Sequence, residues 1–133
     1  MNHRAHREHG EDRDDLSRKI IGCAIRVHKE LGPGLLETAY RVGLAHELTQ
    51  NDVSIEIEKS LPIRYRDVAL DAGYRIDLLV ERRIILELKS VDKLLPVHEA
   101  QLLTYLKLSG LHLGLLINFN VKLLTQGIRR LIL

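Results

Sequence analysis

Two neighbouring segments of the chain carry acidic residues and a lysine at spacings that suit the binding of a divalent cation. Residues 74–80 read Tyr-Arg-Ile-Asp-Leu-Leu-Val and residues 84–89 read Ile-Ile-Leu-Glu-Leu-Lys, which places the polar groups at Asp77, Glu87 and Lys89. Both segments are rich in aliphatic residues, and the charged residues 81–83 between them are typical of a hairpin turn. We therefore expect two antiparallel strands joined at residues 81–83.

The register of this hairpin decides whether the two acids meet. A turn centred on Arg82 places Asp77 directly across from Glu87, with Cβ atoms about 5 Å apart. It also puts Lys89 on the same side, because side chains alternate between faces along a strand. Two facing carboxylates on a half-buried sheet repel each other, and a divalent cation would offset that repulsion. The opposite side would then be entirely apolar and belong to the core, with Ile76, Leu78, Val80, Ile84, Leu86 and Leu88.

Two alternatives to this arrangement remain open. A two-residue turn at residues 82–83 would shift the pairing by one position and send Glu87 to the face opposite Asp77. The apolar alternation favours the first register, because the second would mix polar and apolar side chains on both faces. A surface hairpin whose charges are solvated, or paired as Glu87–Lys89 and Asp77–Arg75, would explain the same residues without a metal.

Length and composition are those of one ordinary globular domain. The chain has 133 residues, of which 45% are hydrophobic and 29% charged, and this length can bury a core without disulfides or structural metal. Residues 1–15 hold many charges and almost no large apolar side chain. We therefore expect a disordered tail at residues 1–15 and a single domain at residues 16–133.

Charge and cysteine content exclude some classes of protein and leave others open. The aromatic content of 4%, with no Trp, argues against a stacking platform for single-stranded nucleic acid, whereas the net charge of +2 permits nucleic-acid binding. The one cysteine, Cys23, excludes an internal disulfide and fits a reducing cytosol. There is no apolar run of about 20 residues and no signal-peptide core. We therefore expect a cytoplasmic protein without a membrane segment.

Hydrophobic periodicity predicts elements in the order α–α–β–β–β–α–β–β. The expected helices cover residues 16–31, 36–50 and 96–109, and the expected strands cover 53–70 (one or two strands), 74–80, 84–89, 113–119 and 128–133. Cys23 falls on the apolar face of the first helix and is expected in the core. Pro62 indicates a bend or an edge position, and Pro96 opens the last helix, which Gly110 ends. That helix would cross between two parallel strands.

Glu37, at the start of the second helix, is a candidate third acid. Its carboxylate could reach over the sheet toward Asp77 and Glu87, but the helix dipole alone also favours an acid there. Tyr40 shares the helix face of Glu37, and it would either hydrogen-bond a site carboxylate or pack in the core. Mg²⁺ takes oxygen ligands and keeps several waters, so Asp77, Glu87 and the Leu88 carbonyl could bind it.

The remaining candidates are Lys89 and the polar residues of the third helix. Lys89 could orient the attacking water or neutralise charge in the transition state. Gln101 and Tyr105 are four residues apart and point the same way. Together with His98 and Glu99 they could form an outer layer of the site, or with Lys107 an edge that contacts phosphate. A solvated face of an amphipathic helix explains these helix residues equally well.

The combination of motifs resembles the GxxExxY protein family, a branch of the PD-(D/E)XK nuclease superfamily. The resemblance runs from about Leu16 to Leu133. Its motifs are Gly34-Leu-Leu-Glu-Thr-Ala-Tyr40, His28-x-x-Leu-Gly-Pro-Gly34, Arg75-Ile-Asp-Leu-Leu-Val80, Glu87-Leu-Lys89, Val97-His-Glu-Ala-Gln-Leu-Leu-Thr-Tyr105 and Leu115-Leu-Ile-Asn-Phe-Asn120.

This resemblance implies an α/β (α+β) fold with a restriction-endonuclease-like mixed sheet flanked by helices and an αβββαβ core. It implies that Asp77 is the first acid of the superfamily, Glu87 the second and Lys89 the lysine, with Glu37 as an additional helix acid. Gln101 and Tyr105 look like the Q-x-x-x-Y element of recombination helicase-nucleases. Ile76 replaces the usual proline before the first acid, which is a common departure.

Three alternative functions follow from these observations. The first is a nuclease that depends on Mg²⁺ or Mn²⁺ and hydrolyses phosphodiester bonds, with DNA expected rather than RNA. The second is a non-catalytic module that keeps the nuclease fold and binds nucleic acid or protein, and another metal-dependent hydrolase is a third alternative. Exposed sheet edges would also allow a homodimer, since a duplex offers two strands to cut.

Overall fold

The computed structural model describes the backbone of residues 2–70 and 73–133 and the side chains of residues 14–70 and 73–133. The helices are α1 (Asn2–Leu31), α2 (Glu37–Gln50), α3 (Pro96–Ser109) and the short 3-10 helix η1 (Leu124–Gly127). The strands are β1 (Ile55–Ser60), β2 (Ile63–Tyr65), β3 (Val68–Leu70), β4 (Arg75–Val80), β5 (Ile84–Lys89), β6 (Leu113–Asn118) and β7 (Ile128–Ile132).

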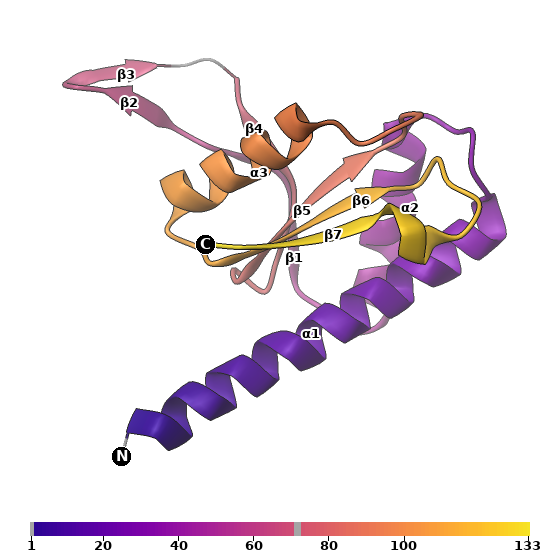
Figure 1. Cartoon of the computed structure of the whole chain (residues 1–133), viewed down its shortest axis with the longest axis horizontal. Helices are drawn as coiled ribbons and strands as arrows, with labels where there is room; N and C mark the ends of the chain where they lie inside the picture. Colours follow the sequence, from indigo (N-terminus) through magenta and orange to yellow (C-terminus); the bar gives the residue numbers. More distant parts are fainter. Residues whose placement is uncertain (1, 71–72) are drawn as a thin grey trace.

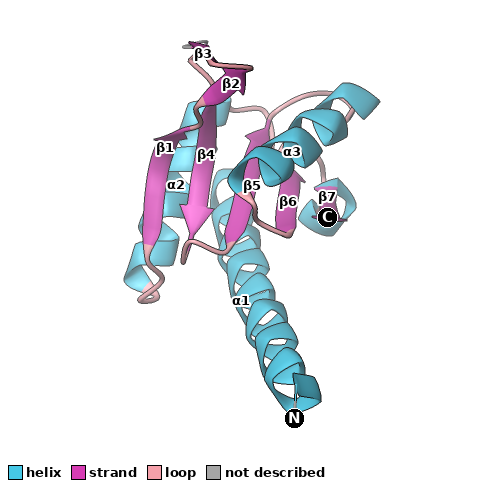
Figure 2. Ribbon diagram, turned by 90° about the vertical axis from the view of Figure 1, so that its left-hand side faces the viewer, coloured by secondary structure: helices cyan, strands magenta, loops and turns pink. Residues whose placement is uncertain are grey.

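A five-stranded mixed sheet forms the centre of the fold. Its order is β1-β4-β5-β6-β7, and β5 and β6 are parallel whereas the other neighbouring strands are antiparallel. Helices α1 and α2 cover one face and α3 covers the other (Figures 1 and 2). The prediction of a mixed sheet flanked by helices is confirmed, as is the crossover of α3 between parallel strands. Pro96 begins α3, and Gly110 ends it in a left-handed conformation.

The β4–β5 hairpin has the register predicted from the apolar alternation. Leu78 pairs with Leu86 and Val80 pairs with Ile84, so the turn contains residues 81–83 and is centred on Arg82. Continued by one position, this register sets Asp77 opposite Glu87. The alternative two-residue turn is therefore wrong, because it would have exchanged the faces of every side chain on β5.

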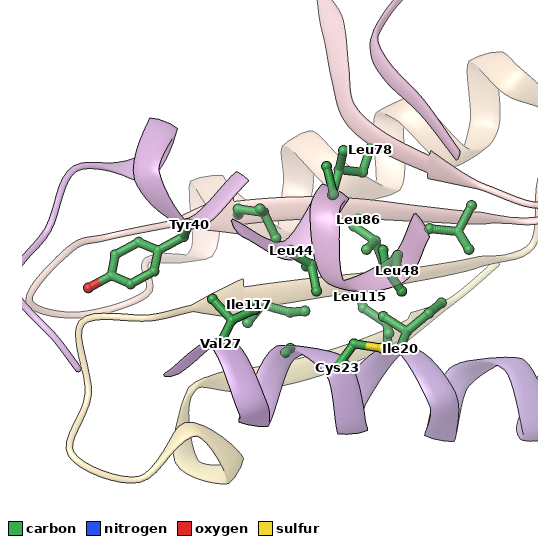
Figure 3. Packing of buried hydrophobic residues seen from close by; sticks show 14 of the residues in the cluster. Ile20, Cys23, Val27, Tyr40, Leu44, Leu48, Leu78, Leu86, Leu115 and Ile117 are labelled. Atoms are coloured by element: carbon green, nitrogen blue, oxygen red, sulfur yellow. The ribbon is translucent and has the colours of Figure 1, made fainter. Parts of the chain in front are cut away.

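Two apolar clusters lie on the two faces of the sheet. The larger one joins α1 and α2 to the sheet through Ile20, Cys23, Val27, Leu44, Leu48, Leu78, Leu86, Leu115 and Ile117 (Figure 3). The smaller one joins α3 to the opposite face through Leu79, Ile85, Leu102, Tyr105, Leu106 and Leu116. Cys23 is fully buried in the larger cluster, as predicted. Strand β6 is buried along its whole length because both clusters cover it.

The face of Ile76 differs from the prediction. Strict alternation would place Ile76 with Leu78 and Val80 against α1 and α2, but it packs in the smaller cluster on the α3 side. The alternation breaks at Asp77, where the β1–β4 ladder skips the pair between Glu58 and Asp77 and Glu58 takes a left-handed conformation with φ 51°. The gap in pairing lies beside Ile76, although neither strand contains an extra residue as in a β-bulge. The unbroken apolar face predicted to include Ile76 is therefore wrong.

Residues 53–70 form three strands where one or two were expected. After β1, the chain bends at Pro62 and makes β2 and β3, which pair only with each other as a separate two-stranded sheet. Figure 1 shows this β2–β3 hairpin projecting from the body of the fold. A proline in an otherwise strand-like run supplies the bend, because it lacks the N–H that a continuous ladder requires.

Helix α1 begins at Asn2, whereas a disordered tail was predicted at residues 1–15. Met1 lies outside the described residues. The first half of α1 extends away from the sheet (Figure 2), and a helix without tertiary packing is only marginally stable in water. Disorder of residues 1–15 in solution therefore stays a prediction. No helix among residues 2–70 and 73–133 combines the length and apolar character needed to cross a membrane.

Candidate active site

Asp77 and Glu87 meet where the β4–β5 ladder ends. The Leu78–Leu86 pair is the last regular pair, and beyond it each carboxylate accepts a hydrogen bond from the main chain near the other acid. The Leu88 N–H donates to Asp77 Oδ2 at 2.8 Å, and the Asp77 N–H donates to Glu87 Oε1 at 3.3 Å. The two strands thus separate locally, and two carboxylates occupy the opening between them.

Burial makes this carboxylate pair electrostatically unfavourable. Glu87 is only 4% exposed. Its burial, with the neighbouring Asp77 charge as the second cause, raises the pKa of Glu87 to about 8, although the Lys89 charge opposes the shift. Among the side chains that the structure describes, no lysine or arginine forms an ion pair with either acid. The pair therefore favours either a shared proton or a bound cation.

The main chain of Leu88 is directed toward the same opening. The Lys89 carbonyl accepts a hydrogen bond from Phe119 N–H on the β6 side of β5. Because successive residues of a strand direct their main-chain groups to opposite sides, Leu88 directs its groups toward β4, as its N–H bond to Asp77 shows. The Leu88 carbonyl is thus directed to the side of β5 on which the carboxylates lie.

Gln101 and Tyr105 are the residues of α3 that the predicted site involves. The Gln101 Nε2 donates to the Tyr105 hydroxyl at 2.9 Å, and the Tyr105 side chain is 4% exposed. Burial is the main cause that raises the pKa of Tyr105, and the negative charges of Glu87 and Asp77 raise it further. The outer layer of the site predicted for Gln101 and Tyr105 stays a prediction, and the burial of Tyr105 is compatible with it.

Tyr74 is a neighbour of this site that the sequence did not single out. Its ring meets the Tyr105 ring edge-on, with centroids 6.4 Å apart and an interplanar angle of 68°. The ring stays 44% exposed and so lies at the border of the site. The only sequence signal was its place directly before the strand that carries Asp77, and this is too general to predict a contact with α3.

His98 has a structural role at the start of α3. Its Nδ1 accepts a hydrogen bond from the Leu95 N–H at 3.0 Å, so it satisfies one of the main-chain donors that a helix leaves free at its first turn. Its place in the outer layer of the site stays a prediction beside this observed capping contact. Sequence spacing could not distinguish the two, because both require a polar side chain in the first turn.

Tyr40 organises the loop between α1 and α2. Its hydroxyl donates to the Gly32 carbonyl at 2.6 Å and accepts from the Leu35 N–H at 3.1 Å. Its ring stacks on Phe119 with centroids 4.5 Å apart, and Figure 3 shows it at the end of the larger apolar cluster. Of the two alternatives left open for Tyr40, packing is the one observed.

Glu37 is exposed at the first turn of α2. The Ser90 hydroxyl donates to the Leu35 carbonyl, which ties the start of α2 to the end of β5, the strand of Glu87. Glu37 therefore lies at the end of the sheet that also holds the acid pair. The three acids nevertheless do not come together, since the described residues contain no group of three His, Cys, Asp or Glu side chains able to hold one ion.

Comparison with known proteins adds one finding to this geometry. A family model described as the PD-(D/E)XK nuclease superfamily matches residues 14–131, nearly the whole chain. No curated protein and no solved structure matches the chain significantly. The finer assignment to the GxxExxY branch stays a prediction.

Proposed function

The chain belongs to the PD-(D/E)XK nuclease superfamily, and from this premise we propose that it is a nuclease that depends on a divalent metal. Its substrate would be a nucleic-acid phosphodiester, in DNA rather than RNA. The observation that carries the proposal is the buried pair of Asp77 and Glu87, joined through main-chain hydrogen bonds at the open end of β4 and β5.

The donors at this position fit a hard divalent cation. Two carboxylates and the Leu88 carbonyl are oxygen ligands, and Mg²⁺ or Mn²⁺ commonly completes such a set with water. Burial and the Asp77 charge raise the pKa of Glu87 more than the Lys89 charge lowers it, so a cation bound beside the pair would stabilise the ionised carboxylates. Bound there, the cation would supply Lewis-acid activation of water and of the phosphate. Glu37 could contribute only through water, because it stands outside the pair.

The other side chains of the site have roles that follow from their positions. Lys89 is near enough for its charge to lower the pKa of Glu87, so its ammonium group could neutralise a phosphate oxygen beside the acids. Tyr105, which accepts a hydrogen bond from Gln101, could shield the α3 side of the site from water. Without a cation, burial and the Asp77 charge favour the protonated form of Glu87, and binding of the metal would release that proton.

A cleavage assay with matched variants tests this function. Purified protein is incubated with plasmid, linear duplex DNA, single-stranded DNA and RNA, in Mg²⁺, in Mn²⁺ and in EDTA. We expect metal-dependent cleavage that Asp77→Asn and Glu87→Gln each reduce by roughly 100-fold or more. Glu81→Gln, at the other end of the same hairpin, is the control that keeps its activity. Cleavage that persists in the Glu87 variant would contradict the proposal.

A binding module that keeps the fold without catalysis is the second candidate. It is favoured by one observation, namely that Glu37 does not join Asp77 and Glu87 in a three-acid group. Under this alternative, nucleic acid binds in EDTA but is not cleaved in any metal, and Mn²⁺ titration shows no affinity that Glu87→Gln removes. Calorimetry of the metal titration separates the two candidates.

A homodimer and a cytoplasmic location also stay predictions. The edges of the large sheet are β1 and β7, and an unpaired edge can add a strand from a second copy. Light scattering of the purified protein over a range of concentrations measures the oligomeric state directly.

A further inference from the structure

The β2–β3 hairpin is an exposed part of the described fold that carries both arginines and an aromatic ring. Its pairs are Ile63 with Leu70, Arg64 with Ala69, and Tyr65 with Val68, so Arg66 and Asp67 form the turn. Tyr65 is 60% and Val68 58% exposed. Large apolar side chains at the tip of a projecting ribbon contribute little to the core, so their exposure requires another explanation.

The hairpin carries two arginines, Arg64 on β2 and Arg66 in the turn. The Arg66 guanidinium lies over the Tyr65 ring, 5.3 Å from its centroid, a cation–π contact that orients the charge. Arg66 also has a positive φ of 55°, a conformation that glycine adopts more easily. The turn therefore has an exposed arginine, in contact with the Tyr65 ring, at a position where a glycine would be less strained.

The base of the hairpin leads directly to the candidate active site. The Leu61 N–H donates to the Tyr74 carbonyl at 2.9 Å, which fixes the two ends of the hairpin to each other. A pocket of about 310 Å³ lies between them, lined by residues including Pro62, Leu70 and Tyr74. Tyr74 then meets Tyr105 beside the acid pair. In Figure 2 the hairpin stands beyond the end of the sheet at which β4 begins and β5 ends.

The charge of this segment is positive. Residues 59–75 contain four basic residues (Lys59, Arg64, Arg66 and Arg75) and two acidic residues (Asp67 and Asp71), a net charge of +2. The whole chain also has a net charge of +2, so these 17 residues hold an excess equal to that of all 133. Their partner is therefore expected to be anionic.

We propose that the β2–β3 hairpin is a nucleic-acid-binding arm that holds a duplex beside Asp77 and Glu87. A two-stranded ribbon fits the major groove of a duplex, and arginines at its tip can contact phosphates on the groove edges. Because Arg66 covers the Tyr65 ring, backbone contact is favoured over stacking of unpaired bases. The inference rests on the proposed nuclease function, which supplies the reason for a substrate at this end of the sheet.

A matched pair of double variants tests the arm. Arg64→Gln with Arg66→Gln removes its charge, and Arg82→Gln with Arg83→Gln removes two arginines from the β4–β5 turn, where Arg82 is also left-handed with φ 54°. Fluorescence anisotropy of a labelled duplex is measured in EDTA at several salt concentrations, and thermal melting verifies that both variants are folded. We expect roughly tenfold weaker binding for the hairpin variant, with a salt slope reduced by about 2.

The control variant should bind within about twofold of the wild type, since its contacts with the nucleic acid should be few. Equal losses in both variants, no loss in the hairpin variant, no binding by the wild type, or tighter binding of a single strand of the same length would each overturn the arm. Because binding is measured without metal, the two proposals fail separately. Hairpin-dependent binding without cleavage contradicts only the nuclease, whereas cleavage that needs Glu87 but not the arginines contradicts only the arm.

Discussion

The two hairpins of this fold each have an arginine with positive φ in the turn, Arg66 and Arg82, but opposite surroundings. The β4–β5 hairpin is covered by helices on both faces and carries the acid pair, whereas the β2–β3 hairpin projects with all three residues of β3 exposed. Burial fixes the register of the β4–β5 hairpin, because a shift by one residue would exchange its buried faces. The carboxylates of Asp77 and Glu87, which must lie close together, are therefore on the buried hairpin. The exposed hairpin is suited to contact a partner.

Burial of the β4–β5 hairpin also explains why β4 tolerates the pairing gap at Asp77. The pairing gap opposite Glu58 removes ladder hydrogen bonds at the site, but the flanking residues remain buried and their apolar contacts keep the strands together. The carboxylates take over two of the free main-chain donors, the N–H groups of Asp77 and Leu88. An exposed hairpin with the same gap would have no such compensation.

The largest difference between the hairpins should appear on truncation of an apolar side chain. Leu86→Ala removes a fully buried side chain of β5 and should lower the free energy of unfolding by about 2–5 kcal/mol. Val68→Ala, in the exposed β3, should lower it by less than about 0.5 kcal/mol. Urea denaturation of both variants measures the difference. Similar losses would mean that the hairpins are equally packed.

The second effect is the pH dependence of the free energy of unfolding that Glu87 causes. Its folded-state pKa of about 8 exceeds the ordinary value of 4.5, so the folded state binds the extra proton between these values. The free energy of unfolding should therefore fall as pH rises from about 4.5 to 8, by at most about 5 kcal/mol. Glu87→Gln should lack this fall and be the more stable protein at pH 9 without metal.

Thermal melting of the wild type and Glu87→Gln from pH 4 to pH 9 in EDTA checks this sign. Below about pH 4.5 the two proteins should have similar stability, because Glu87 is then protonated in both the folded and the unfolded state. Addition of Mg²⁺ at pH 9 should stabilise the wild type more than the variant, since only the wild type has the full carboxylate pair. A constant difference at all pH values would contradict the assignment to Glu87.

The smallest effect separates the two turns. Arg82→Gly relieves a left-handed arginine and should raise the free energy of unfolding by about 0.5 kcal/mol. Arg66→Gly relieves the same conformation but also removes the cation–π contact with Tyr65. The gain and the loss in the free energy of unfolding should therefore cancel within about 0.5 kcal/mol. Chemical denaturation of the two variants in parallel checks the difference. A larger gain for Arg66→Gly would show that the cation–π contact contributes nothing.

Much of the fold could be predicted because its signals are local. Pro96 and Gly110 bracket α3, and the apolar run of residues 113–118 predicts a strand buried on both faces. The alternation on either side of Arg82 was sufficient to choose the register, because only one register keeps both faces consistent. The meeting of Asp77 and Glu87 follows from that register alone.

The roles of Tyr40, Tyr74 and His98 could not be predicted in the same way. Each of these side chains can pack, bond or cap, and the choice depends on neighbours far away in the sequence. Phe119 provides the stacking partner of Tyr40, and α3 brings Tyr105 to Tyr74. Pro62 indicated a bend within residues 53–70, but it could not show that β2 and β3 pair only with each other and project from the main sheet.

The sequence by itself determined which residues alternate, where helices begin and end, and hence which acids face each other across the hairpin. The tertiary structure decided how those acids are surrounded: the rotation of Ile76 to the α3 face, the approach of Tyr105, and the separation of Glu37 from the pair. The physical reason is the distance along the sequence over which each kind of interaction acts. Periodicity and turn chemistry act over a few residues, whereas burial, and with it the pKa of Glu87, is set by elements that meet only when the chain folds.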